Sequence, residues 1–337
     1  MKAVRLSSPR MIGIAEIPEP VRGGGTVKLK IESVGVCGSD IAAYRGTSPL
    51  CTYPRVIGHE LVGRVMEADI GPTALRTGER VVVEPYIPCG RCYPCGIGRT
   101  NCCQHLEVIG VHRDGGMCEF ICHPSQLLHR IPDSIPLAEL ALIEPLSIAV
   151  HAARRLGITK GEHVVILGAG PIGNLTAQVS LASGAIPIMV DILGSRLLIA
   201  ESVGVEFCVN SSKEDVARRV AEITAGRMAE CVVEATGAQA AIRSTPDLAS
   251  FAGRIALVGW PKNELPFPTG TITLKELDMR GSRNSAGDFP RAIELIASGS
   301  VNVRPLITKV VSLDELPESI AVQSDRPDEY MKIVGLF

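Results

Sequence analysis

Four of the eleven cysteines lie in one short stretch that is rich in glycine and proline. They are Cys89, Cys92, Cys95 and Cys103, in the pattern C-x2-C-x2-C-x7-C. Four thiolates on one loop favour a closed tetrahedral zinc site, which is structural because it leaves no position for a substrate. An iron–sulfur cluster and unligated thiols are the alternatives, but bacterial ferredoxin runs end in a spacing of three and a proline. Here the last spacing is seven and Gln104 follows; Cys102 is an alternative to Cys103, although the spacing favours Cys103.

Three further segments each contain one residue of a type that binds zinc. The segments are 35–40, 58–60 and 143–145, and the residues are Cys37, His59 and Glu144. Taken alone, a histidine is more often a buried structural group than a ligand, and Glu144 also fits a charge at a helix end. Together, a thiolate, an imidazole and a carboxylate match a catalytic zinc with an open fourth position.

A glycine-rich stretch near the middle of the chain predicts dinucleotide binding. It begins with an apolar run typical of a buried strand, residues 163–167. The glycines of the pattern G-x-G-x-x-G are Gly168, Gly170 and Gly173, and Pro171 and Ile172 open the helix that follows. The first glycine permits a tight turn, the second lets a pyrophosphate approach the backbone, and the third lets the helix pack on the strand. Free N–H groups at the helix N-terminus then face the phosphates.

A second apolar run ends in Asp191, eighteen positions after Gly173. We expect its carboxylate to accept hydrogen bonds from the adenosine ribose hydroxyls and to repel a 2′-phosphate, which favours NAD over NADP. Arg196 lies close by in the sequence and keeps NADP as the alternative.

Composition excludes several classes of protein. A formal net charge of −2 gives no electrostatic reason to bind nucleic acid or an anionic membrane. No basic stripe accompanies the four cysteines, as it would in a zinc-ribbon nucleic-acid binder. The start of the chain lacks the apolar region of a signal peptide, and no run approaches about 18 uncharged apolar residues. The cysteines therefore indicate metal binding in a cytosolic protein rather than disulfides.

The elements that position these residues fall into two predicted domains of an α/β fold. Short strands with turns, such as 26–36, 61–68 and 116–122, indicate a β-rich first domain, and a helical pattern over 138–156 leads out of it. Between 163 and 281, strands and helices alternate as in a doubly wound parallel sheet. We predict a catalytic domain of residues 1–150, completed by 288–337, and a Rossmann nucleotide-binding domain of residues 151–287.

Over essentially its whole length the chain resembles the zinc-dependent medium-chain dehydrogenases, whose catalytic domain is GroES-like. The matching segments are GVCGSD (35–40), PRVIGHE (54–60), the four-cysteine loop, VIGVHRDGG (108–116), LIEPLSIAVHA (142–152), GAGPIG (168–173) and GSRN (281–284). Glu144 stands where alcohol dehydrogenases carry cysteine, which resembles the polyol (sorbitol, threonine) branch. GRTNCC, VIGVHRDGG and GSRN look most like the bacterial L-galactonate and L-gulonate 5-dehydrogenases and their starvation-sensing relatives.

The resemblance implies a role for each matching residue of the catalytic zinc site. Cys37 and His59 are firm ligands. Glu144 is the third, directly or through water, and Glu60 either replaces it or lies just outside the ligand set. The zinc acts as a Lewis acid on the substrate hydroxyl. Ser39 stands at the family's hydroxyl position for passing on the alcohol proton.

Further implied roles concern the substrate and NAD. The nicotinamide, which accepts the hydride, is held by the glycine-rich loop and by backbone around Gly259. Arg283, in GSRN, matches an arginine that polyol relatives direct into the site. Because arginine binds a carboxylate with two hydrogen bonds, a sugar acid such as L-galactonate or L-gulonate fits; pairing with a glutamate of the site is the alternative. Tyr44 and Trp260 are candidates for stacking on the sugar, with plain packing as the alternative.

One position departs from the family pattern. Many relatives carry a histidine five residues after the cysteine ligand, where it passes the proton to solvent, and here that position is Ala42. His112 is a candidate replacement, although a packing role fits it better. The missing histidine keeps a nucleotide-binding sensor without catalysis as an alternative to an NAD-dependent polyol or sugar-acid dehydrogenase. A simple alcohol dehydrogenase is a further alternative. The resemblance also implies a homodimer or homotetramer with one catalytic and one structural zinc per chain.

Overall fold

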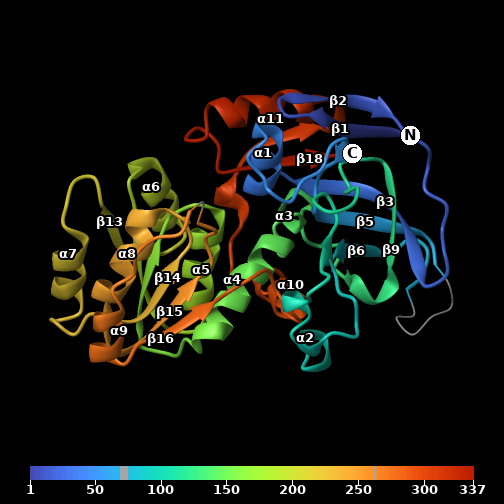
Figure 1. The fold of residues 1–337 in the computed structure, drawn as a ribbon. Helices are drawn as coiled ribbons and strands as arrows, with labels where there is room; N and C mark the ends of the chain where they lie inside the picture. The colour runs from blue at the N-terminus through green and yellow to red at the C-terminus, as the bar shows by residue number, and fades with distance from the viewer. Residues whose placement is uncertain (69–74, 262) are drawn as a thin grey trace. The chain divides into compact units, whose positions relative to one another are not determined.

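The computed structural model describes residues 1–68, 75–261 and 263–337, which form two compact units (Figure 1). Unit 1 comprises Met1–Glu144, Ala292–Ala297 and Leu306–Phe337, and unit 2 comprises Pro145–Arg291 and Ser298–Pro305. Within these described ranges, no helix has both the length and the apolar character required to span a membrane.

The main sheet of unit 1 is built around β3 (Thr26–Gly35), in which Val27, Leu29 and Ile31 are buried at alternate positions. The strand pairs antiparallel with β5 (Glu60–Glu67), β9 (Phe120–Pro124) and β18 (Lys332–Leu336). The same sheet contains β6 (Arg80–Val83), β10 (Leu128–Arg130) and β17 (Ile307–Ser312). Two smaller sheets contain β1 (Lys2–Ser8), β2 (Met11–Glu16) and β4 (Arg55–Val56), and β7 (Tyr86–Ile87) and β8 (Glu107–Val108).

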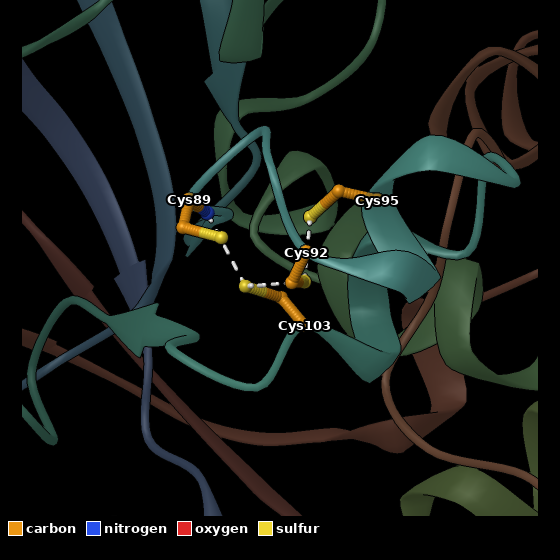
Figure 2. Close-up of side chains that lie close together, drawn as sticks. All are labelled: Cys89, Cys92, Cys95 and Cys103. Carbon is orange, nitrogen blue, oxygen red and sulfur yellow. Dashed lines mark hydrogen bonds between the residues drawn. The ribbon is translucent and has the colours of Figure 1, made fainter.

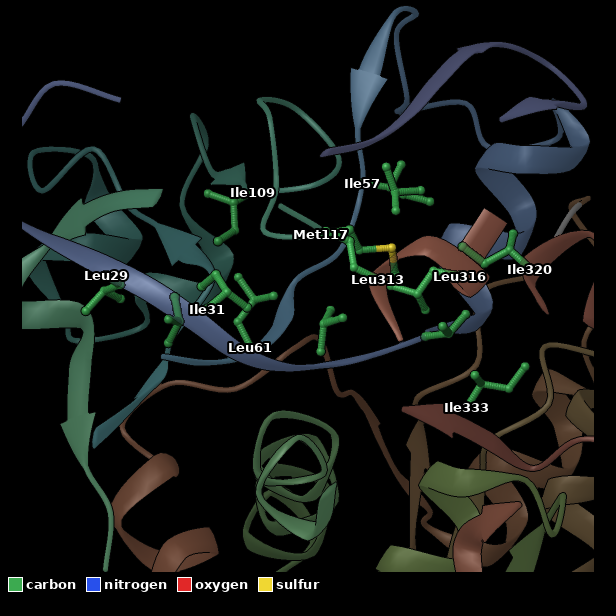
Figure 3. Close-up of a cluster of buried hydrophobic side chains, with 14 of the residues drawn as sticks. Leu29, Ile31, Ile57, Leu61, Ile109, Met117, Leu313, Leu316, Ile320 and Ile333 are labelled. Atoms are coloured by element: carbon green, nitrogen blue, oxygen red, sulfur yellow. The ribbon is translucent and has the colours of Figure 1, made fainter. Parts of the chain in front are cut away.

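The hydrophobic core of unit 1 joins both ends of the chain (Figure 3). Leu29 and Leu61 come from β3 and β5, whereas Leu316 and Ile333 come from the last fifty residues, and all four are fully buried. The helices of this unit are α1 (Gly38–Arg45), α2 (Tyr93–Gly96), α3 (Leu137–Leu140) and α11 (Leu316–Asp325). Short 3-10 helices cover Thr100–Cys102, Ser125–Leu127 and Leu313–Glu315, and a further one, Arg304–Leu306, begins in unit 2 and ends in unit 1. The C-terminal strands therefore complete the core that the first strands begin.

The strand predicted over 116–122 was wrong at its start, because β9 begins only at Phe120. Gly115 and Met117 instead donate backbone hydrogen bonds to Val56 and Ile57, at 2.7 and 3.0 Å. The two backbones are so close that a Cβ on Gly115 would lie 2.2 Å from the carbonyl oxygen of Gly58. This stretch therefore holds the segment that leads into His59.

The single helix predicted over 138–156 was also wrong, because the chain forms α3 and then α4 (Ile143–Leu156). Proline lacks an N–H, and its ring clashes with the carbonyl four residues earlier, so Pro145 cannot continue a helix from α3. It is tolerated in the first turn of a new helix. The break places Glu144 in the first turn of α4.

Unit 2 is a six-stranded parallel sheet in the order β13-β12-β11-β14-β15-β16, covered on both faces. Along β11 (His163–Leu167), Val164 and Ile166 belong to one apolar cluster and Val165 and Leu167 to the other, as the alternation of a strand requires. The other strands are β12 (Ile186–Asp191), β13 (Phe207–Asn210), β14 (Ala229–Glu234), β15 (Ala249–Leu257) and β16 (Asp278–Gly281). The helices are α5 (Pro171–Ala182), α6 (Gly194–Ser202), α7 (Val216–Ile223), α8 (Gln239–Leu248) and α9 (Thr269–Lys275); α10 (Phe289–Ala297) follows β16. The predicted α/β class and doubly wound sheet are confirmed.

Candidate metal centres and dinucleotide site

The four cysteines of the glycine- and proline-rich loop converge on one point (Figure 2). Their sulfur atoms all lie within 4.8 Å of one another, and Cys92 Sγ is 3.4 Å from Cys95 Sγ and 3.8 Å from Cys103 Sγ. Four sulfurs placed tetrahedrally at the usual zinc–sulfur distance lie about 3.8 Å apart. The geometry therefore fits a closed zinc site, and its fourth member is Cys103 rather than the neighbouring Cys102.

The pKa values of the thiols in this cysteine group also fit the binding of a cation. Backbone N–H groups of Gln104 and Cys95 lower the pKa of Cys92 to about 6. Desolvation and the adjacent thiol of Cys92 raise the pKa of Cys95 to about 12. A bound cation would favour the thiolate forms of all four cysteines, because metal ligation requires deprotonated sulfur.

A second group lies in unit 1, where Cys37, His59 and Glu60 each offer a ligand atom within 4.8 Å of the others. Cys37 precedes α1, and His59 directly precedes β5, whose first residue Glu60 is opposite Gly35 of β3. Glu144 is outside this group of three, although it is 1 % exposed and its charge is felt by His59. The structure therefore brings the two sequence-adjacent residues together with Cys37.

Asp40 joins the two loops that carry these groups. Its carboxylate accepts hydrogen bonds from the backbone N–H of Cys37 at 2.9 Å and of Gly58 at 3.2 Å. One of its oxygens also lies 3.9 Å from Nδ1 of His59. Metal-binding histidines commonly direct their second nitrogen toward such a carboxylate. Sequence reasoning missed Asp40, although its place in the first turn after Cys37 was a usable signal.

The second group fits a divalent cation. Among the described residues, Nδ1 of His59 is a buried nitrogen with no hydrogen-bond partner. Burial lowers the pKa of His59, but the thiol of Cys37 and the carboxylate of Asp40 outweigh that effect and hold it well above the ordinary value. The groups near the His59 imidazole are thus the thiol of Cys37 and three buried carboxyl groups, those of Asp40, Glu60 and Glu144. These groups favour a positive charge at the imidazole. A metal ion bound by these donors would supply that charge.

Tyr86 was also missed by sequence reasoning. Its hydroxyl donates a hydrogen bond to Oε1 of Glu144, and both side chains are buried. Burial raises the pKa of Glu144 to about 7, and burial together with Glu144 raises the pKa of Tyr86 well above its ordinary value. The hydrogen bond restrains the carboxylate from a position 58 residues away, which no local pattern signals.

In unit 2 the glycine-rich loop adopts a conformation that requires glycine at two positions. Gly168 has a φ of +100°, and a Cβ on Gly173 would lie 1.7 Å from the carbonyl oxygen of Gly168. At Gly170 the nearest atom to such a Cβ is Nη1 of Arg196, 3.6 Å away. The protein itself therefore tolerates a side chain at Gly170, and the open space fits a ligand that approaches the backbone.

Asp191 lies at the end of β12, where both carboxylate oxygens accept backbone hydrogen bonds. Oδ2 accepts from Ala169 at 2.7 Å and Oδ1 from Leu193 at 2.8 Å. Each carboxylate oxygen has a second lone pair, so two further donors can be accepted. Gly259 faces the turn after β14, and a Cβ there would lie 2.1 Å from the backbone nitrogen of Gly237. These contacts hold the edge of the sheet at which the dinucleotide is predicted to bind.

The other predicted site residues have varied surroundings. Ser39 is exposed on α1, and Tyr44 is 8 % exposed within the core of unit 1. Nδ1 of His112 accepts a hydrogen bond from the backbone N–H of Val108 at 3.1 Å, which stabilises the turn between these two residues. Arg283 is exposed after β16, and Trp260 is 72 % exposed. Their roles in proton transfer and substrate binding stay predictions.

Comparison with known proteins gives a consistent result over the whole chain. Residues 23–133 match the family described as alcohol dehydrogenase GroES-like domain, and residues 171–298 match zinc-binding dehydrogenase. An uncharacterized zinc-type alcohol dehydrogenase-like protein of Haemophilus influenzae is 52 % identical over 338 residues, which cover 100 % of this chain and 99 % of the relative. L-galactonate-5-dehydrogenase of Escherichia coli is 38 % identical and covers 86 % of this chain, with 85 % of its own length matched.

Solved structures agree with this match. A short chain alcohol dehydrogenase from Escherichia coli, complexed with NADH, superposes with a TM-score of 0.94 at 32 % identity. The match covers 100 % of this chain and 99 % of that structure. The similarity therefore extends across both units.

Proposed function

The chain belongs to the zinc-binding alcohol dehydrogenase family, and we propose that it oxidises a secondary alcohol of a sugar acid or polyol with NAD as hydride acceptor. The observation that carries the proposal is the group of Cys37, His59 and Glu60 in unit 1, in which the histidine and the glutamate are buried and the cysteine is half-buried. We assign zinc chemistry to residues 1–150 with 288–337 and dinucleotide binding to residues 151–287. When bound, zinc supplies a Lewis acid for the substrate alcohol, and NAD accepts the hydride.

Each residue of the proposed zinc site has a separate task. Cys37 and His59 hold the metal, and Asp40 orients both through the backbone of their loops. Glu60 is the third ligand because it lies in the group of three, and Glu144 acts through water from its hydrogen bond with Tyr86. The cysteine loop holds a second, structural zinc, which stabilises the fold without contacting substrate.

The dinucleotide site is proposed to favour NAD. The N-terminus of α5 offers N–H groups to the pyrophosphate, and Gly170 leaves room for it. Asp191 keeps acceptor capacity for the two ribose hydroxyls and repels a 2′-phosphate. Arg196, whose Nη1 lies close to Gly170, is proposed to contact a phosphate, which would reduce the preference for NAD over NADP.

The substrate is proposed to be an aldonate such as L-galactonate or L-gulonate. Similarity to an L-galactonate-5-dehydrogenase supports a sugar acid, and Arg283, an exposed residue, is proposed to bind its carboxylate through the guanidinium. Ser39, exposed on the first turn of α1, is proposed to accept the alcohol proton and pass it to water in the absence of a histidine at position 42.

The test is NADH formation measured against hexonates, hexitols, pentitols and simple alcohols, with and without a chelator. We expect chelator-sensitive activity that is strongest on aldonates. Activity on neutral polyols alone would keep the zinc chemistry and exclude Arg283 as a carboxylate-binding residue. Activity that survives complete removal of zinc would overturn the proposed mechanism.

A further inference from the structure

A fully buried carboxylate ends the fourth strand of the parallel sheet in unit 2. Glu234 is the last residue of β14 and is 0 % exposed. In the described part of the chain, the hydrogen-bond partners of its carboxylate are Thr236 and Gly237, and neither is a cation. Burial of a charge is costly unless a partner compensates it. A carboxylate kept in such a place therefore calls for an explanation beyond packing.

The groups that contact this carboxylate all donate hydrogen bonds to it. The backbone N–H of Thr236 donates to Oε1 at 2.8 Å, and that of Gly237 lies 3.0 and 3.2 Å from the two oxygens. The hydroxyl of Thr236 accepts the N–H of Ala238 at 2.9 Å and donates its own proton to Oε1. An ionised carboxylate accepts such bonds and has no proton to donate. These contacts therefore stabilise the negative form.

The carboxylate lies at the edge of the sheet where the dinucleotide is proposed to bind. Glu234 is opposite Leu167, which directly precedes the glycine-rich loop, and a Cβ on Gly259 would lie 2.7 Å from its Oε2. In the order β13-β12-β11-β14-β15-β16, the direction of the chain's progress reverses between β11 and β14. Sheets of this kind bind one nucleotide of the pair on each half. Since Asp191 is assigned to the adenosine half, Glu234 belongs to the half left for the nicotinamide.

The nicotinamide ring is positively charged in NAD⁺ and neutral in NADH, so a fixed negative charge nearby interacts differently with the two forms. We propose that Glu234 determines the redox-state preference of the dinucleotide site by stabilising bound NAD⁺ relative to bound NADH. The inference rests on the proposed function, in which NAD⁺ is the form that must bind before an alcohol is oxidised. Burial reduces the screening of this charge by solvent ions.

The alternative is that Glu234 only folds the turn that follows β14. Loss of a structural role would weaken the binding of both forms by the same factor, whereas loss of the charge would weaken only NAD⁺. Glu234→Gln separates the two cases, because it keeps the size and one acceptor oxygen but removes the charge. Glu230→Gln is the matched control: Glu230 lies at the amino end of the same strand, where its carboxylate accepts the N–H of His163 at 2.7 Å.

The measurement is the dissociation constant of each form without substrate, by fluorescence titration for NADH and by competition against NADH for NAD⁺. In Glu234→Gln we expect NAD⁺ to bind about fivefold more weakly, with the affinity for NADH unchanged. Glu230→Gln should change neither constant. Equal weakening of both forms in Glu234→Gln, or no change in either, would overturn the proposal.

A second variant, Glu234→Asp, covers the case in which the glutamine variant does not fold. It keeps the charge and shortens the side chain, so both affinities should change together and their ratio should stay within about twofold of the wild-type ratio. A larger shift of the ratio toward NADH in Glu234→Asp would overturn the proposal. Absence of turnover would count against the proposed function alone, because these titrations need no substrate. A protein that bound neither NAD⁺ nor NADH would overturn both.

Discussion

Asp40 accepts a hydrogen bond from the backbone N–H of Gly58 at 3.2 Å, across eighteen positions of the chain. With its second oxygen it accepts from Cys37, so one buried carboxylate sets the separation of the loops that carry Cys37 and His59. Backbone hydrogen bonds to this carboxylate thus link the two loops of the candidate metal site.

Replacement of Asp40 by asparagine is expected to loosen the zinc site. The amide can accept only one of the two backbone bonds, and its NH2 group faces the other donor. We expect zinc affinity to fall by about 10- to 100-fold, measured as metal retained during dialysis against a competing chelator. Asp133→Asn, at an exposed position paired with Arg80, is the control. Equal retention in both variants would refute the joining role of Asp40.

Cys37→Ser is expected to abolish turnover while the fold and NAD binding persist. A serine hydroxyl stays protonated where the site needs a thiolate, so the proposed zinc would lose a permanent ligand. Circular dichroism and NADH binding report the intact units, and NADH formation reports the chemistry. Cys51→Ser serves as the control, since Cys51 is outside both ligand groups. Retained turnover in Cys37→Ser would remove the catalytic zinc from the mechanism.

Cys95→Ser is expected to lower stability instead. A closed zinc site contributes to folding, so Tm should fall by about 5 °C or more and the metal content should drop by one zinc per chain. Cys102→Ser is a closely matched control, because Cys102 is adjacent to Cys103 but not a member of the group of four. If Cys102→Ser were the more damaging change, the assignment of the fourth ligand would be reversed.

Asp191→Ala is expected to reduce the preference for NAD over NADP. The replacement removes the repulsion of a 2′-phosphate and two backbone hydrogen bonds, so the KM for NAD should rise about tenfold. Arg196→Gln should have the opposite effect on the ratio, because it removes a cation that a 2′-phosphate would contact. The measurement is kcat/KM with each dinucleotide, and an unchanged ratio in Asp191→Ala would contradict the cofactor assignment.

His123 predicts a pH dependence of stability. Burial lowers its pKa to about 4, and its Nε2 lies 2.9 Å from the carbonyl oxygen of Glu84. The unfolded chain binds a proton at this histidine near pH 6.5 while the folded protein does not, so its contribution is full above pH 6.5 and is lost between pH 6.5 and 4. The loss amounts to about 3 kcal/mol. The difference in unfolding free energy between wild type and His123→Gln, measured over that window, should narrow accordingly; parallel curves would contradict it.

Features contained in one short segment were predictable from the sequence. The cysteine spacing places four thiols on a single loop, and the glycine pattern matches the φ of Gly168 and the close approach of Gly173 to it. Both depend on interactions between residues a few positions apart, so spacing alone encodes them. The same holds for the alternation of Val164 and Val165 between the two faces of a parallel sheet.

Other features depend on segments that only the folded chain brings together. Residues 116–119 have a strand-like pattern, yet Gly115 and Met117 bond to the segment before His59. Tyr86 restrains Glu144 across 58 positions, and Lys332 pairs with Glu60 across 272. Sequence alone determined which residue types bind zinc and dinucleotide, because ligand chemistry and local spacing are properties of the segments themselves. Only the tertiary structure shows that the carboxylate beside Cys37 and His59 is that of Glu60 and that Lys332 forms an ion pair with it. The reason is that a buried charge needs a partner, and the packing of strands far apart in the sequence determines which residue is close enough.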